Sequence, residues 1–186
     1  MADVTFFDVR RLPLDADAAE VALAMTEDEF RAFYDRTSRP LWAYLSRISG
    51  DRQIADDLLQ EAYYRLLRVN VSFESESHRR NYLYRVATNL VHDTRRRARP
   101  SIDRSVEPAD VAGPAPEADA ETRADVRRAL GHLKPRERAL LWLAYAHGSS
   151  HAEIAGVLGL KTASIKLLLF RARRKLAKIL EGQAGS

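Results

Sequence analysis

The chain has 186 residues and a formal net charge of +4, and its 46% apolar content is enough for one ordinary domain or two small ones. It contains no cysteine, which excludes disulfide frameworks and thiolate metal sites and is typical of a reducing cytoplasm. No segment approaches the roughly 18 consecutive apolar residues of a membrane span, and residues 1–17 lack the pattern of a signal peptide, so we expect no direct membrane insertion.

The helical spacing of apolar residues predicts a first helical bundle. A capping box formed by Thr26 and Glu29 marks the start of its first helix, and Gly50 marks a turn. We expect the next two helices at about residues 51–68 and 78–97.

The helix expected at residues 51–68 has two different sides. Leu58 and Leu66 belong to an apolar stripe that we expect to pack in the bundle. The other side of the helix is acidic. Such a face repels nucleic acid and suits contact with a basic protein surface, although the simpler interpretation is that it is merely solvated. The acidic and polar side chains on or bordering this face are Asp56, Asp57, Gln60, Glu61 and Tyr64.

The helix expected at residues 78–97 lies in a basic segment, since residues 79–99 contain seven arginines and one acid. Leu83 and Leu90 mark its core stripe, and Tyr82 and Tyr84 lie beside the opposite one. Cations, amides and aromatic rings in one segment favour contacts with phosphates and stacking on unpaired bases. The alternative is an arginine-rich solvent face with core tyrosines. The opposite stripe carries Arg85, Thr88, Asn89, His92, Arg95, Arg96 and Arg99.

Residues 100–125 reverse the charge, with seven acids and two arginines, and residues 100–116 hold four of the seven prolines. This composition cannot bury enough apolar surface to order itself, so it predicts a linker. The basic–acidic–basic order suggests two nucleic-acid-facing modules joined by a tether of opposite charge. The alternative is solvated helix faces joined by a polar linker.

The second predicted bundle ends in a helix-turn-helix pattern. Ser150 and Glu153 form another capping box, and Gly159 suits a tight turn before a longer basic helix. The expected fold class is therefore all-α: two small helical domains joined by a flexible acidic linker, the second domain carrying the helix-turn-helix. Its helices are expected at about residues 120–133, 135–147, 150–158 and 162–180.

The last predicted helix has an unusual surface for a helix that reads DNA. Ile165 and Leu169 lie on its core stripe, whereas Leu167 and Phe170 point the other way, where polar tips would be expected. The polar and basic side chains available for base edges and phosphates are Ser164, Lys166, Arg171, Arg173 and Arg174.

Sequence motifs give no sign of catalysis. His147 and His151 have the spacing of two metal ligands on one helix face, but Gly148 interrupts that helix and no third ligand is evident nearby. We find no glycine-rich phosphate loop, nucleophile motif or paired-carboxylate site. We therefore expect no enzyme, no cofactor and no metal site.

Three segments resemble, in order, parts of bacterial RNA polymerase sigma factors of the sigma-70 family, extracytoplasmic-function (ECF) type. Region 2.2 of that family resembles DRQIADDLLQEAYYRLLR, regions 2.3 and 2.4 resemble NYLYRVATNLVHDTRRRAR, and region 4 resembles LKPRERALLWLAYAHGSSHAEIAGVLGLKTASIKLLLFRARRKL. The resemblance implies an N-terminal extension, a region 2 domain, the acidic linker, a region 4 domain and a tail, at residues 1–25, 26–99, 100–119, 120–182 and 183–186.

The resemblance also implies that the protein binds core RNA polymerase in the bacterial cytoplasm, directs it to promoters and helps to open the duplex. The clamp helices of the largest polymerase subunit would contact Asp56, Asp57, Gln60, Glu61 and Tyr64. The minus-ten promoter DNA would contact Asn81, Tyr82, Arg85, Thr88, Asn89, His92, Arg95, Arg96 and Arg97. The loop at residues 71–77 would capture a flipped base. The acidic linker would run through the RNA exit path as an RNA mimic, or serve only as a solubilising spacer.

Region 4 would contact the minus-thirty-five element through Ser164, Lys166, Leu167, Phe170, Arg171, Arg173 and Arg174. The chain departs from the family at Leu167 and Leu168, where the family usually has polar or basic residues, and at Phe170, where it often has histidine. Three interpretations of the Leu167 and Phe170 side chains stay open. They contact thymine methyl groups, they form an apolar patch that binds a protein such as an anti-sigma factor or the first bundle, or they belong to a helix that docks only shallowly on DNA. Two other functions stay open: a stand-alone helix-turn-helix regulator, and a sigma-like adaptor that binds polymerase but not promoters.

Overall fold

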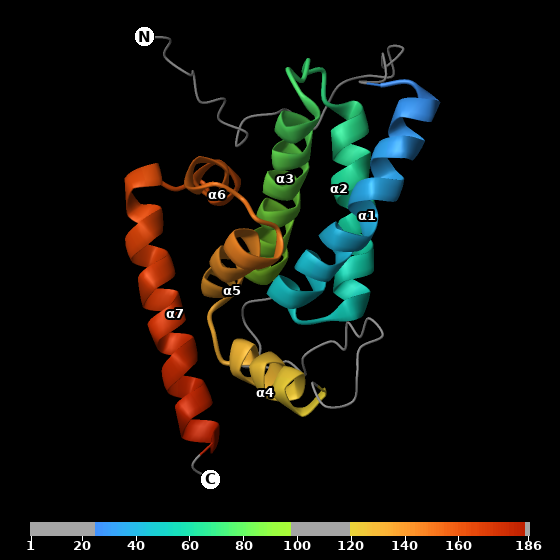
Figure 1. Ribbon diagram of the computed structural model, residues 1–186. Helices are drawn as coiled ribbons and strands as arrows, with labels where there is room; N and C mark the ends of the chain where they lie inside the picture. Colours follow the sequence, from blue (N-terminus) through green and yellow to red (C-terminus); the bar gives the residue numbers. More distant parts are fainter. Residues whose placement is uncertain (1–24, 98–119, 185–186) are drawn as a thin grey trace.

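In the computed structural model, the described residues, 25–97 and 120–184, form helices and the turns between them, and no strand occurs in these two stretches (Figure 1). The all-α prediction is confirmed. None of the described helices is long and apolar enough to cross a membrane. The predicted linker at residues 100–119 and the N-terminal extension lie outside the described residues, apart from Met25. The elements are α1 (Glu27–Ser49), α2 (Arg52–Arg68), α3 (Glu76–Arg97), α4 (Ala120–Gly131), α5 (Pro135–Leu141), η3 (Trp142–Ala146), α6 (His151–Leu158) and α7 (Thr162–Ala184).

Local capping signals set several helix ends. The Thr26 hydroxyl accepts a hydrogen bond from the Glu29 N–H, and the Glu29 carboxylate accepts one from the Thr26 N–H, which completes the predicted capping box of α1. Ser150 and Glu153 form the same box at α6. Gly50 ends α1 with φ 83° and Gly159 ends α6 with φ 63°, a left-handed conformation that glycine adopts without steric cost.

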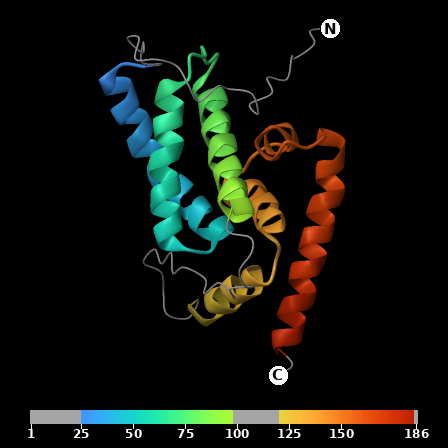
Figure 2. The same ribbon diagram turned by 180° about the vertical axis from the view of Figure 1, so that it is seen from behind.

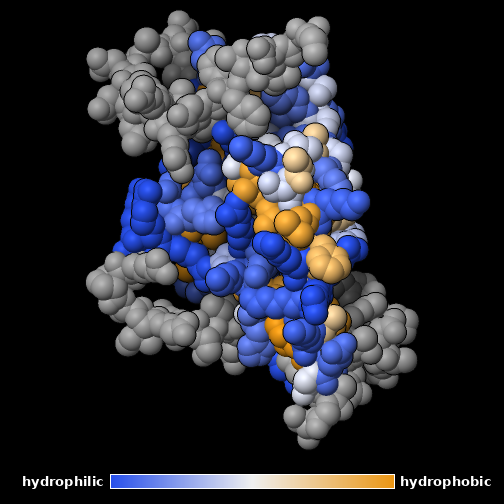
Figure 3. All heavy atoms as spheres, turned by 90° about the vertical axis from the view of Figure 1, so that its left-hand side faces the viewer, coloured by the Kyte–Doolittle hydropathy of each residue, from blue (hydrophilic) through white to orange (hydrophobic). Residues whose placement is uncertain are grey.

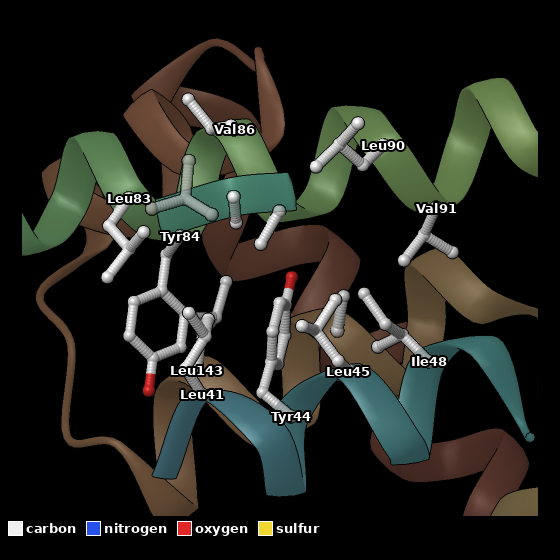
Figure 4. Close-up of a cluster of buried hydrophobic side chains, with 14 of the residues drawn as sticks. Leu41, Tyr44, Leu45, Ile48, Leu83, Tyr84, Val86, Leu90, Val91 and Leu143 are labelled. Carbon is white, nitrogen blue, oxygen red and sulfur yellow. The ribbon is translucent and has the colours of Figure 1, made fainter. Parts of the chain in front are cut away.

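The first three helices lie side by side and bury a core of large side chains (Figure 4). Leu41 and Tyr44 of α1 face Leu83 and Tyr84 of α3, and all four are at most 1% exposed. The Tyr44 hydroxyl lies 2.7 Å from the Thr88 hydroxyl, so this buried polar pair satisfies its own hydrogen bonds inside the core. Burial of these rings fixes the position of α3, the helix that carries the arginine-rich segment.

The helix predicted at residues 135–147 divides into an α-helical part, α5, and a π-helical part, η3. After α5 the chain widens into the π-helical turn η3, where the His147 N–H donates to the Trp142 carbonyl at 3.0 Å. Gly148 then takes φ 70°, which ends the helix. Leu143 of this turn is 1% exposed and joins the core of the first bundle (Figure 4).

The two halves pack against each other in the closed arrangement described here. Helix α6 packs on α3 and α5 packs on α1, whereas α7 lies on α4, α5 and α6 at the outer side of the molecule (Figures 1 and 2). Buried side chains of both halves belong to one hydrophobic cluster. Side chains of α3 and α6 therefore share a contact surface.

Candidate functional site

The predicted acidic face of α2 is exposed to solvent. Asp51 caps the helix by accepting hydrogen bonds from the N–H groups of Gln53 and Ile54, so the helix begins one residue after the predicted start. Leu58 and Leu66 are buried, which turns the opposite face outward. On that face Asp56, Asp57, Gln60 and Tyr64 are exposed and Glu61 is partly exposed.

Neighbouring side chains hold this face in shape. The Asp56 carboxylate accepts a hydrogen bond of 2.6 Å from the indole N–H of Trp42, which ties α2 to α1. Glu61 pairs with Arg65 at 2.7 Å, one turn further along the helix. The Tyr64 ring lies 5.2 Å below the guanidinium of Arg68, which also donates a hydrogen bond to the tyrosine hydroxyl. The negative charge of the face is therefore least compensated near Asp57.

Helix α3 turns most, but not all, of its predicted polar stripe outward. The prediction that Thr88 lies on this face is wrong: its side chain is 2% exposed and its hydroxyl donates to the Tyr84 carbonyl at 2.7 Å. Tyr84, predicted beside the face, is also a core residue at 1% exposed. Arg85 is partly exposed, the exposed members of the stripe are Asn89, His92, Arg95 and Arg96, and Arg99 lies outside the described residues. Arg97, which the family resemblance assigns to the minus-ten DNA, is exposed as well.

The basic end of α3 has a strongly positive local field. Arg96 pairs with Asp93 at 3.1 Å, and both lie on the last turns of the helix. Partial burial lowers the pKa of the His92 imidazole, and the cations Arg136 and Arg95 lower it further. A neutral imidazole among guanidinium groups can donate and accept hydrogen bonds without adding to their repulsion.

An aromatic cluster that the sequence did not reveal surrounds Tyr82. The Phe73 ring, in the loop at residues 71–75, lies 5.4 Å from the Tyr82 ring and 5.7 Å from the His78 ring. The Arg79 guanidinium lies 5.6 Å from the Phe73 ring. Burial raises the pKa of Tyr82, whose phenol is half-buried against this cluster. The loop and the start of α3 thus offer flat rings and a cation next to one another.

Asn81 meets the second half of the molecule. Its amide donates a hydrogen bond of 3.2 Å to the Glu153 carboxylate of α6, and the Ser77 hydroxyl donates to the same oxygen at 3.2 Å. The hydrogen bonds from Ser150 are the main reason why the pKa of Glu153 falls to about 2, and Asn81 and Ser77 contribute less. A carboxylate therefore occupies part of the α3 surface that was predicted to contact DNA.

Helix α7 presents its predicted apolar side chains to solvent. Ile165 and Leu169 are buried, whereas Leu167 is 51% exposed and Phe170 is 52% exposed. Figure 3 shows apolar side chains between hydrophilic ones on the side of the molecule that carries α7. Phe170 and two arginines border a shallow hollow, and the exposed basic residues of the helix include Lys166, Arg171, Arg173 and Arg174. Ser164 is partly buried near the start of the helix.

The two histidines at residues 147 and 151 have different surroundings. The His147 ring lies 4.5 Å from the Tyr84 ring, and its Nδ1 atom lies 2.8 Å from the Ser149 hydroxyl. His151 is exposed at the start of α6. Among the described residues, no group of three or more histidines, aspartates or glutamates could hold a metal ion. His147 instead packs the second half against the first.

Comparison with known proteins places both halves in one family. The family described as Sigma-70 region 2 matches residues 33–100, and the family described as Sigma-70, region 4 matches residues 123–176. The ECF RNA polymerase sigma factor SigL of Mycobacterium tuberculosis is 34% identical over 172 residues, which cover 89% of this chain and 93% of that protein. The ECF RNA polymerase sigma factor SigE of Mycolicibacterium smegmatis is 32% identical over 173 residues, which cover 89% of this chain and 65% of that protein.

Solved structures show the same fold. The sigma factor RpoE, in complex with the anti-sigma factor NepR from Bartonella quintana, has a TM-score of 0.68 at 22% identity and covers 83% of this chain and 98% of its own. CnrH, in complex with the cytosolic domain of CnrY, has a TM-score of 0.62 at 23% identity, and the match covers 84% of this chain and 90% of CnrH. From the two matched regions and the identity to SigL, the chain belongs to the sigma-70 family of RNA polymerase sigma factors, in its ECF group.

Proposed function

We propose that this ECF sigma factor binds core RNA polymerase through α2, contacts promoter DNA through α3 and α7, and assists promoter melting. The observation that carries the proposal is the pairing of two unlike surfaces on adjacent helices: the carboxylate face of α2 and the arginine-rich face of α3. Opposite charges allow one small domain to hold a basic protein surface and a polyanion at the same time. The protein acts by binding, without a catalytic step of its own, in the bacterial cytoplasm.

The polymerase contact is centred on Asp57 and Gln60, with Asp56, Glu61 and Tyr64 around them. Asp57 and Gln60 are exposed, and no described side chain forms an ion pair with Asp57. The clamp helices of the largest subunit are the proposed partner of this face. Because these groups already point outward in the closed arrangement, polymerase can reach α2 without prior rearrangement.

The minus-ten contact is proposed for the exposed part of α3 and for its first turns. Asn89, His92 and the three arginines at its end offer amide, imidazole and guanidinium donors to bases and phosphates. Thr88 is left out because its hydroxyl is used inside the core. Tyr82 and Arg85 are partly exposed and stand closer to the loop.

The loop predicted at residues 71–77, whose last two residues lie in the first turn of α3, is the proposed place for a flipped base. Phe73 and Tyr82 supply rings on which a base can stack, and Arg79 supplies a cation beside them. Stacking on an aromatic side chain stabilises a bound base by about 1–3 kcal/mol, which is comparable with the cost of taking it out of the duplex. Promoter melting therefore has a physical basis in this part of the domain.

The minus-thirty-five contact is proposed for the outer face of α7. Leu167 and Phe170 stand exposed among arginines, an arrangement that combines apolar contact with thymine methyl groups and cationic contact with phosphates. An anti-sigma factor is a second proposed partner of the protein, as RpoE and CnrH were solved with NepR and CnrY bound.

Promoter binding requires the two halves to separate at α6. In the closed arrangement Glu153 accepts the hydrogen bond from the Asn81 amide, so a DNA base or phosphate has to displace a carboxylate there. Like charges repel, and both a phosphate and Glu153 are anionic. The closed molecule therefore binds the minus-ten DNA less well than a molecule in which α6 has left α3.

Run-off transcription tests the proposal. Purified core polymerase is given a pool of promoter fragments with and without the protein, and we expect new start sites only when the protein is present. If core polymerase binds the protein but no start site appears, the chain is a sigma-like adaptor. If the protein binds duplex DNA tightly without polymerase and starts no transcript, it is a stand-alone regulator.

A further inference from the structure

Trp42 of α1 is bonded to the carboxylate face of α2. Helices α1 and α2 pack side by side (Figure 1), and the Trp42 indole N–H donates a hydrogen bond of 2.6 Å to the Asp56 carboxylate. The indole ring is partly buried and packs on the hydrophobic core. Since an indole has one N–H donor, this bond and the core contact together set the orientation of the ring.

A second contact holds Trp42 on the same helix. The guanidinium of Arg52, the first residue of α2, lies 5.8 Å from the centre of the Trp42 ring. A cation over the face of an indole is attracted by the ring's quadrupole. Arg52 and Asp56 are four residues apart and lie on one side of α2, so the ring bridges two successive turns of that helix.

Asp56 differs from the other residues predicted to contact polymerase. Glu61 and Tyr64 pair with arginines of α2 itself. Asp56 is the one of the five for which a hydrogen bond to a side chain of another helix is found among the described residues. Its Oδ1 atom accepts the indole N–H, and no described residue forms a hydrogen bond with its Oδ2 atom. One carboxylate oxygen is therefore held against α1, and the other is available to a partner.

The hydrogen bond orders a carboxylate that would otherwise rotate in solvent. A bond from an N–H to an ionised carboxylate is stronger than one between neutral groups. Asp56 precedes Asp57 and lies one turn before Gln60, the two exposed residues at the centre of the proposed polymerase contact. Side chains that are already ordered lose less conformational entropy when a partner binds. A carboxylate held in this way therefore favours association.

We propose that Trp42 is a positioning residue for the polymerase contact and acts through its hydrogen bond to Asp56. The inference rests on the proposed function of the α2 face, and it extends the surface that determines polymerase affinity from α2 to α1. The family resemblance implies a contact for Asp56 and none for Trp42. A variant that lacks the indole N–H leaves Asp56 free to rotate and binds the basic surface of polymerase more weakly.

Nuclear magnetic resonance of the full-length protein tests the hydrogen bond itself. The chain has two tryptophans, so the proton–nitrogen spectrum holds two indole signals, and Trp142→Phe removes one of them and assigns the other to Trp42. Asp56→Ala is expected to move the Trp42 signal towards lower proton frequency, because a hydrogen bond is lost. Asp57→Ala removes a neighbouring charge of the same sign and should move the signal much less. A Trp42 signal that Asp56→Ala leaves in place would overturn the inference.

A double-mutant cycle in the affinity for core RNA polymerase tests the role of the bond. Trp42→Phe keeps an aromatic ring and removes the N–H, so it is expected to weaken binding roughly fivefold in the parent and less than about twofold in the Asp56→Ala background. The matched control is Trp142→Phe, because Trp142 is also partly buried and also stacks with an arginine, Arg47, at 5.4 Å. The control should bind polymerase like the parent, and urea denaturation checks that each variant is folded.

Equal weakening by Trp42→Phe in both backgrounds would also overturn the inference, because Trp42 would then act independently of Asp56. The variant Asp57→Lys with Glu61→Lys separates this failure from a failure of the proposed function. If that variant loses affinity while Trp42→Phe keeps it, the positioning role is wrong and the polymerase contact stands. If both keep it, the proposed polymerase contact fails as well.

Discussion

Replacing Glu153 with glutamine probes the contact that holds α6 on α3. The Glu153 carboxylate accepts hydrogen bonds from Ser150 in its own helix cap and from Asn81 and Ser77 across the domain boundary. Together they lower its pKa from 4.5 to about 2, which corresponds to about 3.4 kcal/mol at about 1.36 kcal/mol per pKa unit. Because Glu153 is partly exposed and Ser150 is the largest cause, solvent screening leaves about 1 kcal/mol in total, of which roughly half acts between the domains.

The pH dependence of this contribution has a definite sign. Folding depresses the pKa of Glu153, so the stabilisation is fully present above its ordinary pKa of 4.5 and is lost as the pH falls through about 2. Urea denaturation of the parent and of Glu153→Gln should therefore give a constant difference in unfolding free energy between about pH 8 and pH 5. The difference should shrink below that range and disappear near pH 2.

A matched control separates the domain contact from the helix cap. Glu137 also accepts a hydrogen bond from a cap N–H, that of Lys134 at 2.7 Å, and it pairs with Lys175 at 2.7 Å inside its own half. Both substitutions should lower stability, but only Glu153→Gln should shift the energy-transfer efficiency between fluorophores attached at Asp35→Cys on α1 and Lys178→Cys on α7, two exposed positions, towards an open state. Equal shifts for Glu137→Gln and Glu153→Gln, or none for Glu153→Gln, would refute the reasoning.

Two further variants test the core around α3 and the surface of α7. Thr88→Val removes the hydroxyl bonded to Tyr44 and to the Tyr84 carbonyl and should lower the unfolding free energy by about 1–3 kcal/mol in urea denaturation; an unchanged midpoint would show that Thr88 is not in the core. Leu167→Ser with Phe170→Ser should leave stability within about 0.5 kcal/mol, because both side chains are half exposed, but should reduce promoter-directed transcription. Unchanged transcription together with an unchanged melting curve would end the idea that these two residues contact DNA or a partner.

Much of the fold was predictable because its signals are local. The capping boxes at Thr26 and Ser150 place the starts of α1 and α6, and the helix-turn-helix follows from the spacing around Gly159. The spacing of leucines in α2 likewise separates its buried side from its acidic side. The family resemblance is confirmed by matches to both sigma regions, which cover residues 33–100 and 123–176.

The errors on α3 arise at the edge of its apolar stripe. At 100° per residue Thr88 falls beside core positions, and a hydroxyl can enter a core when partners are present. The Tyr84 carbonyl, one turn earlier in α3, and the Tyr44 hydroxyl supply those partners, but Tyr44 becomes a neighbour only after α1 packs on α3. Sequence spacing alone could not distinguish this threonine from the exposed Asn89 next to it.

The contacts between the domains could not be predicted from periodicity. Glu153 was recognised as a capping residue, but its bond to Asn81 joins positions 72 residues apart. The same holds for Arg138, whose burial against the end of α1 depends on the docking of the two halves. An arginine on a short helix gives no local sign that it will be buried, so the burial of Arg138 became visible only in the structure.

The affinity for core RNA polymerase tests the central claim, that the carboxylate face of α2 recruits the enzyme. The variant Asp57→Lys with Glu61→Lys reverses two charges on this face, and Glu27→Lys with Asp35→Lys makes the same change in net charge on α1. In a titration of labelled protein with core polymerase, we expect the α2 variant to bind at least tenfold more weakly and the α1 variant to bind like the parent. An α2 variant that binds core polymerase as tightly as the parent would contradict the account.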